Sequence, residues 1–288
     1  MSEVFAACRP RLLGIAYGML GEMGEAEDVV QDAWLHWSDA DTAAVRNAEA
    51  YLVTITTRLA LDRLRSARSR RETYVGPWLP EPLVADEADP ETLAIEASEL
   101  SLALLGTLER LNPVERAVLI LRDVFDLEYA EIADVLDRTP TNCRQLARRA
   151  REHAGDATRR RPVTPEQEQR LVAAFMTATA TGDLEAIQGV LAADAILYSD
   201  GGGEVTAARR PIYGAAKIAR FFVGVQRKQT FPPDIAYTPA RINGDPGVRM
   251  DTPAGLLGVL ALELSDEAIV GVRIVLNPHK LAHLKARA

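Results

Sequence analysis

The stretch of sequence that decides the fold is Tyr129-Ala-Glu-Ile-Ala-Asp-Val-Leu-Asp137-Arg-Thr-Pro140-Thr-Asn-Cys143-Arg-Gln-Leu-Ala-Arg-Arg-Ala150. Apolar residues recur at offsets of 0, 3, 4 and 7 in two windows, which begin at Tyr129 and Cys143. This spacing predicts two short amphipathic helices. The polar residues between them predict a tight turn, and Asp137 tolerates the left-handed conformation better than most residues. Two short helices joined in this way form a helix-turn-helix.

On the second of these helices, polar side chains lie opposite the apolar stripe, because each residue turns the helix by about 100°. Arginine can pair with guanine and glutamine with adenine, and any arginine can neutralise a phosphate. A solvated charged face would use the same residue types, but the preceding helix and turn favour contact with DNA. The candidate DNA-binding residues are Thr141, Asn142, Arg144, Gln145, Arg148 and Arg149.

Arginine is concentrated in two bursts, with six between residues 58 and 71 and eight between residues 138 and 161. Residues 72–137 between them carry sixteen acidic residues and three arginines, so the overall charge of −8 hides two basic elements. Such an arrangement indicates contact with a polyanion at two separated places. For the first burst alone, an exposed helix end is an equally good interpretation, since arginines there complement the helix dipole.

The chain of 288 residues is long enough for two or three domains. The first 161 residues contain no lysine, whereas residues 162–288 carry thirteen charges of each sign, which indicates a boundary near Arg161. Two distant cysteines do not suggest a disulfide framework or a zinc site, and no metal or cofactor is expected. No signal peptide or membrane-spanning apolar run is evident, so we expect a soluble, cytoplasmic protein without membrane contact.

Helical spacing also covers the residues before the helix-turn-helix. One helix is predicted from Phe5 to Met19, ending at Gly21, a second from Ala26 to Trp37, and a third from about Glu49 into the first arginine burst. A Pro-rich acidic segment at residues 76–90 predicts a linker. Helices are predicted again at residues 91–111 and after Asn112-Pro113, where proline suits a first helical turn.

These residues resemble a known family. Glu25-Ala-Glu-Asp-Val-Val-Gln-Asp-Ala-Trp34 and residues 50–65 resemble the sigma-2 domain of extracytoplasmic-function (ECF) sigma factors. Residues 111–136 and 144–151 resemble its sigma-4 domain. The resemblance covers residues 3–155 and implies a non-enzymatic factor that binds core RNA polymerase and directs transcription from particular promoters.

The resemblance also implies partners for particular residues. The second helix of sigma-2 would dock on the clamp helices of the largest polymerase subunit, and the flap of the second largest subunit is a further expected partner. The implied clamp contacts are Asp28, Gln31, Asp32 and Trp34, although Trp34 is equally compatible with a core position. The implied contacts to the minus-10 promoter element are Arg58, Arg63, Arg65, Arg68, Arg70 and Arg71. The loop at about residues 38–47 would hold an extruded base, and the second helix of the helix-turn-helix would read the minus-35 element.

After residue 161 the pattern changes from helices to a mixture of helices and strands. Thr164-Pro-Glu-Gln167 predicts a capped helix to about Thr181. A shorter helix at residues 183–191, strands at residues 195–199, 255–264 and 268–276, and a helix at residues 214–224 follow. Helices followed by a curved antiparallel sheet predict an α+β cone, which resembles the SnoaL-like branch of the NTF2-like fold. Such cones include enzymes and binding proteins, so a small ligand in the cone is one candidate partner.

A subgroup of ECF sigma factors combines such a C-terminal domain with a linker motif similar to Trp78-Leu-Pro-Glu-Pro82. Asp200-Gly-Gly-Gly203 and Asn277-Pro-His-Lys-Leu281 resemble two further motifs of that subgroup. Members often have Lys after the glycines and Asp in the last motif, where this chain has Glu204 and His279. The implied regulatory residues are Trp78, Leu79, Pro80, Asp200, Gly201, Gly202, Gly203, Asn277 and Pro278. We expect the glycine loop to pack on the linker or on sigma-2 and to set the relation of the two DNA-binding domains, although glycines also suit a simple flexible turn.

We therefore predict two all-α sigma domains followed by an α+β cone: sigma-2 at residues 1–73, a linker at 74–92, sigma-4 at 93–158 and the cone at 164–288. One alternative is a helix-turn-helix regulator that never meets polymerase, but its function would not need the acidic helix at residues 25–37. Another is proton transfer in the cone by Asp200, Asp251 or His279. An aspartate on a glycine turn is poorly placed for the burial that would raise its pKa, which disfavours catalysis.

Overall fold

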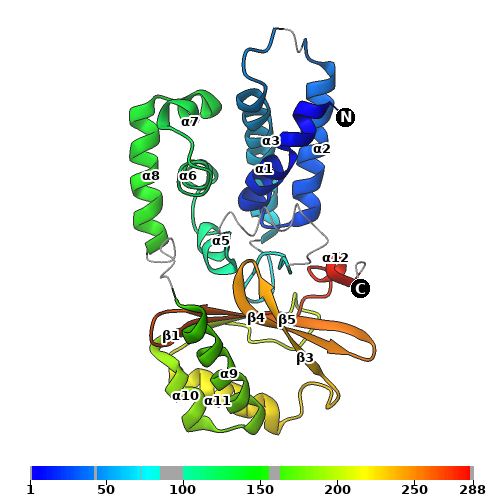
Figure 1. Ribbon diagram of the computed structural model, residues 1–288, viewed down its shortest axis with the longest axis vertical. Coiled ribbons are helices and arrows are strands. Elements are labelled where there is room, and N and C mark those ends of the chain that lie inside the picture. The colour runs from blue at the N-terminus through cyan, green and yellow to red at the C-terminus, as the bar shows by residue number, and fades with distance from the viewer. Residues whose placement is uncertain (1, 42–43, 72, 85–99, 156–162, 286–288) are drawn as a thin grey trace. The chain divides into compact units, whose positions relative to one another are not determined.

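The computed structural model describes residues 2–41, 44–71, 73–84, 100–155 and 163–285, and the side chains of all of these except 67–71. These residues form two compact units (Figure 1). The first unit contains residues 2–73, 100 and 104–155. The second contains residues 74–84, 101–103 and 163–285. The first part of the predicted linker therefore belongs to the same unit as the C-terminal domain.

Three helices open the first unit, as the apolar spacing predicted: α1 (Glu3–Leu20), α2 (Met23–Asp39) and α3 (Ala48–Arg71). Gly21 ends α1 in the left-handed conformation with a φ of 70°, where its amide donates to the Tyr17 carbonyl. The buried face of α1 includes Leu12 and Ile15, and α1 packs on both α2 and α3. The predicted helices of this region are confirmed.

The remaining helices of this half of the chain are α5 (Leu102–Leu108), α6 (Pro113–Leu119), the π-helical turn η1 (Ile120–Val124), α7 (Tyr129–Leu136) and α8 (Pro140–Ala154). Asn112 and Glu115 form a capping box at the start of α6. Between α7 and α8, Asp137 is left-handed with a φ of 53°, and Thr139 caps α8. The helix-turn-helix is confirmed. The first part of the helix predicted at residues 91–111 lies outside the described residues.

The second unit is an α+β domain with one six-stranded sheet in the order β2-β1-β6-β5-β4-β3. Its strands are β1 (Leu191–Asp200), β2 (Ile212–Tyr213), β3 (Ala236–Ile242), β4 (Asp245–Thr252), β5 (Gly255–Leu264) and β6 (Ile269–Val275). Its helices are α9 (Pro165–Thr181), α10 (Leu184–Val190), α11 (Ala215–Arg227) and the short α12 (Ala282–Lys285). The predicted fold class is confirmed.

The sheet differs from the prediction in its pairing and in three strands, β2, β3 and β4, that were not predicted. It is mixed rather than antiparallel, because β1 pairs in parallel with β6, with Leu197 opposite Val272. The hairpin of β3 and β4 was not predicted, although Asn243-Gly244 at its turn is a known hairpin signal. Most residues of β3 are exposed and Pro239 lies within it, so the strand lacks the apolar alternation by which strands are recognised.

Both faces of the sheet carry apolar side chains. In Figure 1, α9, α10 and α11 lie together against one side of the sheet, where Phe175, Ile218 and Leu262 belong to one core cluster. A second cluster joins Val259 and Val275 to Leu79 of the segment before residue 85. Among the helices of the described chain, none has the length and apolar character needed to span a bilayer.

Candidate functional site

The polar face of α8 is accessible, as the helix-turn-helix pattern predicted. Cys143, Ala147 and Ala150 are buried on the opposite face. Of the predicted contacts to the minus-35 element, Asn142 is half-buried and the other five, Thr141, Arg144, Gln145, Arg148 and Arg149, are exposed. Burial raises the pKa of the Cys143 thiol, which therefore stays protonated and acts as a core residue. This helix can present donors and positive charge to a DNA groove.

An ion pair fixes α8 to the turn before the helix-turn-helix. Arg151 hydrogen-bonds the carboxylate of Asp123, with 2.9 Å between Nε and Oδ2. This bond, opposed in part by burial, raises the pKa of Arg151 above its ordinary value. Nearby, the buried Arg116 donates two hydrogen bonds to the Gly18 carbonyl of α1, at 3.0 and 3.1 Å. The Arg151 pair thus joins α8 to η1, and Arg116 joins α6 to α1.

In the N-terminal helices, one arginine forms ion pairs with three carboxylates. Nη1 of Arg63 on α3 lies 3.0 Å from Oε2 of Glu25 and 3.1 Å from Oδ2 of Asp28, and Nη2 lies 2.8 Å from Oδ2 of Asp32. Burial alone would lower the pKa of Arg63, but hydrogen bonds to Asp28, Asp32 and Glu25 raise it. The Arg63 cluster, as we call these four residues, joins predicted polymerase contacts on α2 to a predicted DNA contact on α3.

The other residues predicted to touch polymerase or the minus-10 element fall in different settings. Gln31 is exposed, whereas Trp34 packs edge-to-face on Phe5 with 5.0 Å between ring centroids. Nε of Arg58 donates to the Val135 carbonyl at 3.0 Å, at the last turn of α7. Arg65 is exposed and pairs with Asp62 at 2.7 Å. Arg68, Arg70 and Arg71 continue α3, but their side chains lie outside the described part.

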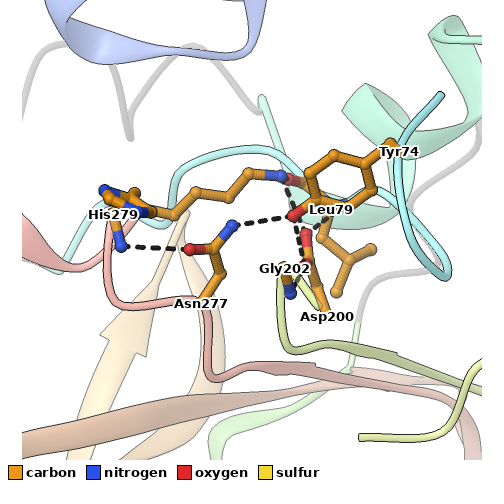
Figure 2. Close-up of polar contacts among 7 residues, drawn as sticks. Tyr74, Leu79, Asp200, Gly202, Asn277 and His279 are labelled. Atoms are coloured by element: carbon orange, nitrogen blue, oxygen red, sulfur yellow. Dashed lines mark hydrogen bonds and ion pairs between the residues drawn. The ribbon is translucent and has the colours of Figure 1, made fainter. Parts of the chain in front are cut away.

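The second unit contains a buried carboxylate at the end of β1. Asp200 is 1% exposed and each of its carboxylate oxygens accepts two hydrogen bonds (Figure 2). Oδ1 accepts from the Tyr74 hydroxyl at 2.6 Å and from the Gly202 amide at 3.0 Å. Oδ2 accepts from the Leu79 amide at 2.9 Å and from Nζ of Lys280 at 2.8 Å. This carboxylate therefore connects β1 to two points of the segment before residue 85.

Lys280 completes the arrangement from the other side. Its Nζ also donates to the Leu79 carbonyl and lies 4.1 Å from the ring centroid of Trp78 and 4.8 Å from that of Tyr74. An ammonium group over aromatic rings is stabilised by their quadrupoles. In Figure 2, Asn277 points toward the Tyr74 hydroxyl, to which Nδ2 donates at 2.7 Å. We call Tyr74, Trp78, Leu79, Asp200, Asn277 and Lys280 the Asp200 network.

Glycine is required beside this network. Gly202 has a φ of 64°, and a Cβ atom on it would lie 2.5 Å from Nδ2 of Asn277. Farther along the segment, the Leu83 amide donates to Oδ1 of Asn243 at 2.9 Å, and the Asn243 amide donates back to the Leu83 carbonyl at 2.8 Å. His283 lies with Nε2 3.0 Å from the Pro82 carbonyl. Residues 74–84 are thus bound to the C-terminal domain along most of their length.

One expectation about this site is wrong. Asp200 was expected on an exposed glycine turn, where burial would not act on its carboxyl, yet it is among the most buried polar residues described. The reason is that β1 continues to Asp200 and residues 74–84 cover it. The two positions that depart from the subgroup's motifs contact each other: Nε2 of His279 lies 2.7 Å from Oε1 of Glu204.

Comparisons with known proteins decide the family. The model of Sigma-70 region 2 matches residues 4–70, and that of Sigma-70, region 4 matches residues 101–153. The ECF RNA polymerase sigma factor SigJ of Mycobacterium tuberculosis is 35% identical over 96% of this chain and 91% of its own length. The probable ECF sigma factor SigI of the same species is 31% identical over 99% and 96%. The chain belongs to the ECF sigma factors. ECF sigma factors direct transcription initiation and are not enzymes.

The similarity to SigJ includes the C-terminal domain of this sigma factor. The crystal structure of SigJ superposes with a TM-score of 0.78 at 32% identity and covers 98% of both chains. The Asp200 network therefore lies in a domain that this sigma factor shares with a full-length relative. Sequence reasoning identified Trp78, Leu79, Asp200, Gly202 and Asn277 of this region, and the structure brings all of them together.

Two members of the network were not among the predicted site residues. Lys280 lies within the quoted Asn277-Pro-His-Lys-Leu281 motif, so the resemblance that pointed to Asn277 and Pro278 is the signal that could have found it. Tyr74 carries no signal in the sequence, because its role depends on Asp200, which is 126 positions away. Pro80 of the predicted set is buried and Pro278 is half-buried.

Proposed function

We propose that this ECF sigma factor binds core RNA polymerase, directs initiation at specific promoters, and is modulated by its own C-terminal domain through residues 74–84. The Asp200 network carries the second part of the proposal. It holds both the backbone and the side chains of a segment that lies, in the chain, between region 2 and region 4. Contacts that hold residues 74–84 in place would limit the positions that the two DNA-binding regions can adopt relative to each other.

The residues proposed to contact polymerase and promoter are those of α2, α3 and α8. The proposed contacts to the clamp helices are Asp28, Gln31, Asp32 and part of the Trp34 ring. The flap of the second largest subunit is proposed as a second contact. The arginines of α3 would bind the minus-10 element. The exposed face of α8 supports reading of the minus-35 element, since its donors can reach base edges and phosphates. The protein would act in the cytoplasm, where core polymerase works.

Two of these proposals suggest an order of events in the Arg63 cluster. The carboxylates of Asp28 and Asp32 are proposed to face polymerase, yet they are paired with Arg63, which is proposed to face DNA. Binding of the carboxylates by basic groups of polymerase would free the guanidinium for a phosphate. Contact with polymerase would therefore favour contact with the minus-10 element.

The test of the main proposal is promoter-specific transcription in vitro with core polymerase and the full chain. Tyr74→Phe removes two hydrogen bonds of the network, those of the Tyr74 hydroxyl with Asp200 and Asn277, and Asp200→Asn removes the charge of the carboxylate. We expect either variant to change transcription about fivefold or more, a typical coupling between linked sites, while the affinity for core polymerase stays the same. The controls are Tyr213→Phe and Asp194→Asn, which change exposed residues of the same domain.

Two outcomes would contradict the proposal. Unchanged transcription by both network variants would show that residues 74–84 do not transmit an effect of the C-terminal domain. Failure of the wild-type chain to bind core polymerase would favour a helix-turn-helix regulator that acts without it.

A further inference from the structure

A cavity of about 1260 Å³ lies between the sheet and helices α9 and α11 of the C-terminal domain. Its wall is mainly apolar and includes Phe175, Phe222, Met250 and Leu260. Cavities that bind small molecules in proteins are mostly apolar and carry a few well-placed polar groups. The volume is sufficient for a molecule with a long or polycyclic apolar body.

Charge around this cavity is of one sign. Two exposed cationic residues line the cavity: Arg220 in the middle of α11 and Lys228 directly after it. Neither makes an ion pair with a carboxylate among the described residues, and the lining contains no aspartate or glutamate in that part of the chain. By contrast, Arg241 of β3 pairs with Glu168 at 2.6 Å. The opening thus offers unpaired positive charge beside an apolar interior.

The wall also contains hydroxyl groups. Ser199 of β1 lines the cavity and is 2% exposed. Tyr237 at the wall adds a second hydroxyl, and partial desolvation raises its pKa although the residue is 51% exposed. It therefore stays a neutral hydrogen-bond donor.

The geometry points to a binding site for an apolar carboxylic acid, whose hydrocarbon body lies in the cavity and whose carboxylate meets a cation of its lining, Arg220 or Lys228. A neutral hydrocarbon would leave the cationic opening unused, and a cationic amphiphile would be repelled by it. A carboxylate gains charge-assisted hydrogen bonds there.

The site shares its wall with the Asp200 network. Successive residues of a strand point to opposite faces, and β1 accordingly presents Ser199 to the cavity and Asp200 to the network. Leu276 also lines the cavity, and its amide donates to the Asp200 carbonyl at 2.7 Å. If the proposed regulatory function holds, a ligand in the cavity is one residue away from the contacts that hold residues 74–84.

The binding test uses the full chain and three probes of equal chain length: decanoate, decanol and decyltrimethylammonium, all below their micelle concentrations. We expect decanoate to bind about tenfold more tightly than decanol, because a charge-assisted hydrogen bond contributes on that order. Decyltrimethylammonium should bind more weakly than both. Titration calorimetry measures the affinity for each probe directly. The rise in melting temperature that each probe causes checks the order of the affinities independently.

Variants locate the site. Arg220→Gln with Lys228→Gln should remove the preference for decanoate over decanol, whereas the matched pair Lys217→Gln with Arg227→Gln, on the same helix but outside the cavity lining, should keep it. Met176→Trp narrows the cavity and should weaken the binding of both probes, with folding checked by circular dichroism.

Three outcomes overturn the inference: no binding of decanoate at millimolar concentration, equal binding of the anionic and cationic probes, or binding by a folded Met176→Trp variant that is as tight as binding by wild type. None of these measurements involves transcription, so failure of the ligand inference can be distinguished from failure of the proposed regulatory function.

Discussion

The Arg63 cluster and the Asp200 network both pair basic side chains with carboxylates, but their exposure to solvent is opposite. The side chain of Arg63 is 30% exposed, and those of its partners Asp28 and Asp32 are 64% and 43% exposed. The side chains of Lys280 and Asp200 are 7% and 0% exposed. Exposed pairs contribute about 0–1 kcal/mol, whereas removing one partner of a buried pair costs about 3–5 kcal/mol.

This difference suggests different uses for the two clusters. The Arg63 cluster can exchange its partners for a polymerase side chain or a phosphate, because little free energy is lost when one pair opens. The Asp200 network cannot open without leaving a buried charge. We interpret the first as an exchangeable contact surface and the second as a permanent attachment of residues 74–84.

The largest expected effect comes from breaking the buried network. Asp200→Ala should lower the free energy of unfolding by about 3–5 kcal/mol, since Nζ of Lys280 would keep its charge without a carboxylate partner. Urea denaturation followed by tryptophan fluorescence would measure this, because Trp78 lies in the network. Asp194→Ala, on an exposed position of the same strand, should change the value by less than about 0.5 kcal/mol. A loss below about 1 kcal/mol in Asp200→Ala would refute a permanent attachment.

A smaller effect is expected from the glycine that supports the network. Gly202→Ala places a Cβ atom against Asn277 and imposes a left-handed conformation on alanine, which costs about 1–2 kcal/mol. Gly189 of α10 is the matched control, since a Cβ there meets no atom within 4 Å and alanine favours the helix. Gly189→Ala should be neutral or stabilising in the same denaturation experiment. Equal effects of the two variants would show that the loop adapts freely.

The exposed cluster should respond to salt in a way that the buried network does not. Arg63→Gln should lower the free energy of unfolding by about 1 kcal/mol or less. This loss should shrink between 0.05 and 1 M salt, where the screening length falls from roughly 14 Å to roughly 3 Å. Arg65→Gln, which removes a pair within α3, is the control for loss of charge. A loss that is large and independent of salt would place Arg63 with the buried residues.

Local patterns in the sequence were sufficient for the helical half of the fold. The two windows of apolar spacing beginning at Tyr129 and Cys143 lie within single helices, and Asp137 adopted the left-handed turn expected of it. Such features depend on neighbours a few residues away, so a single sequence contains the necessary information.

Features that depend on distant residues were predicted poorly. The burial of Asp200 is caused by residues 74–84, and the parallel pairing of β1 with β6 joins positions about 75 residues apart, such as Leu197 and Val272. Exposed β3 shows no apolar alternation, so only Asn243-Gly244 signalled its hairpin. The motif resemblance supplied four residues of the network but not Tyr74 or Lys280, and the hydrogen-bond partners of Asp200 followed only from the structure.

The smallest expected effect concerns the two residues at which this chain departs from the subgroup's motifs. Where members often have Lys and Asp, this chain has Glu204 and His279, which are 52% and 80% exposed at their side chains and still contact each other. When His279 is protonated, the two side chains carry opposite charges, as Lys and Asp do, but the acidic and the basic residue have exchanged positions. Glu204→Lys together with His279→Asp should therefore leave the free energy of unfolding within about 0.5 kcal/mol of wild type. Glu204→Lys alone places two basic groups together and should be slightly less stable than the double variant. A double variant less stable than either single change would show that these positions have roles beyond their mutual contact.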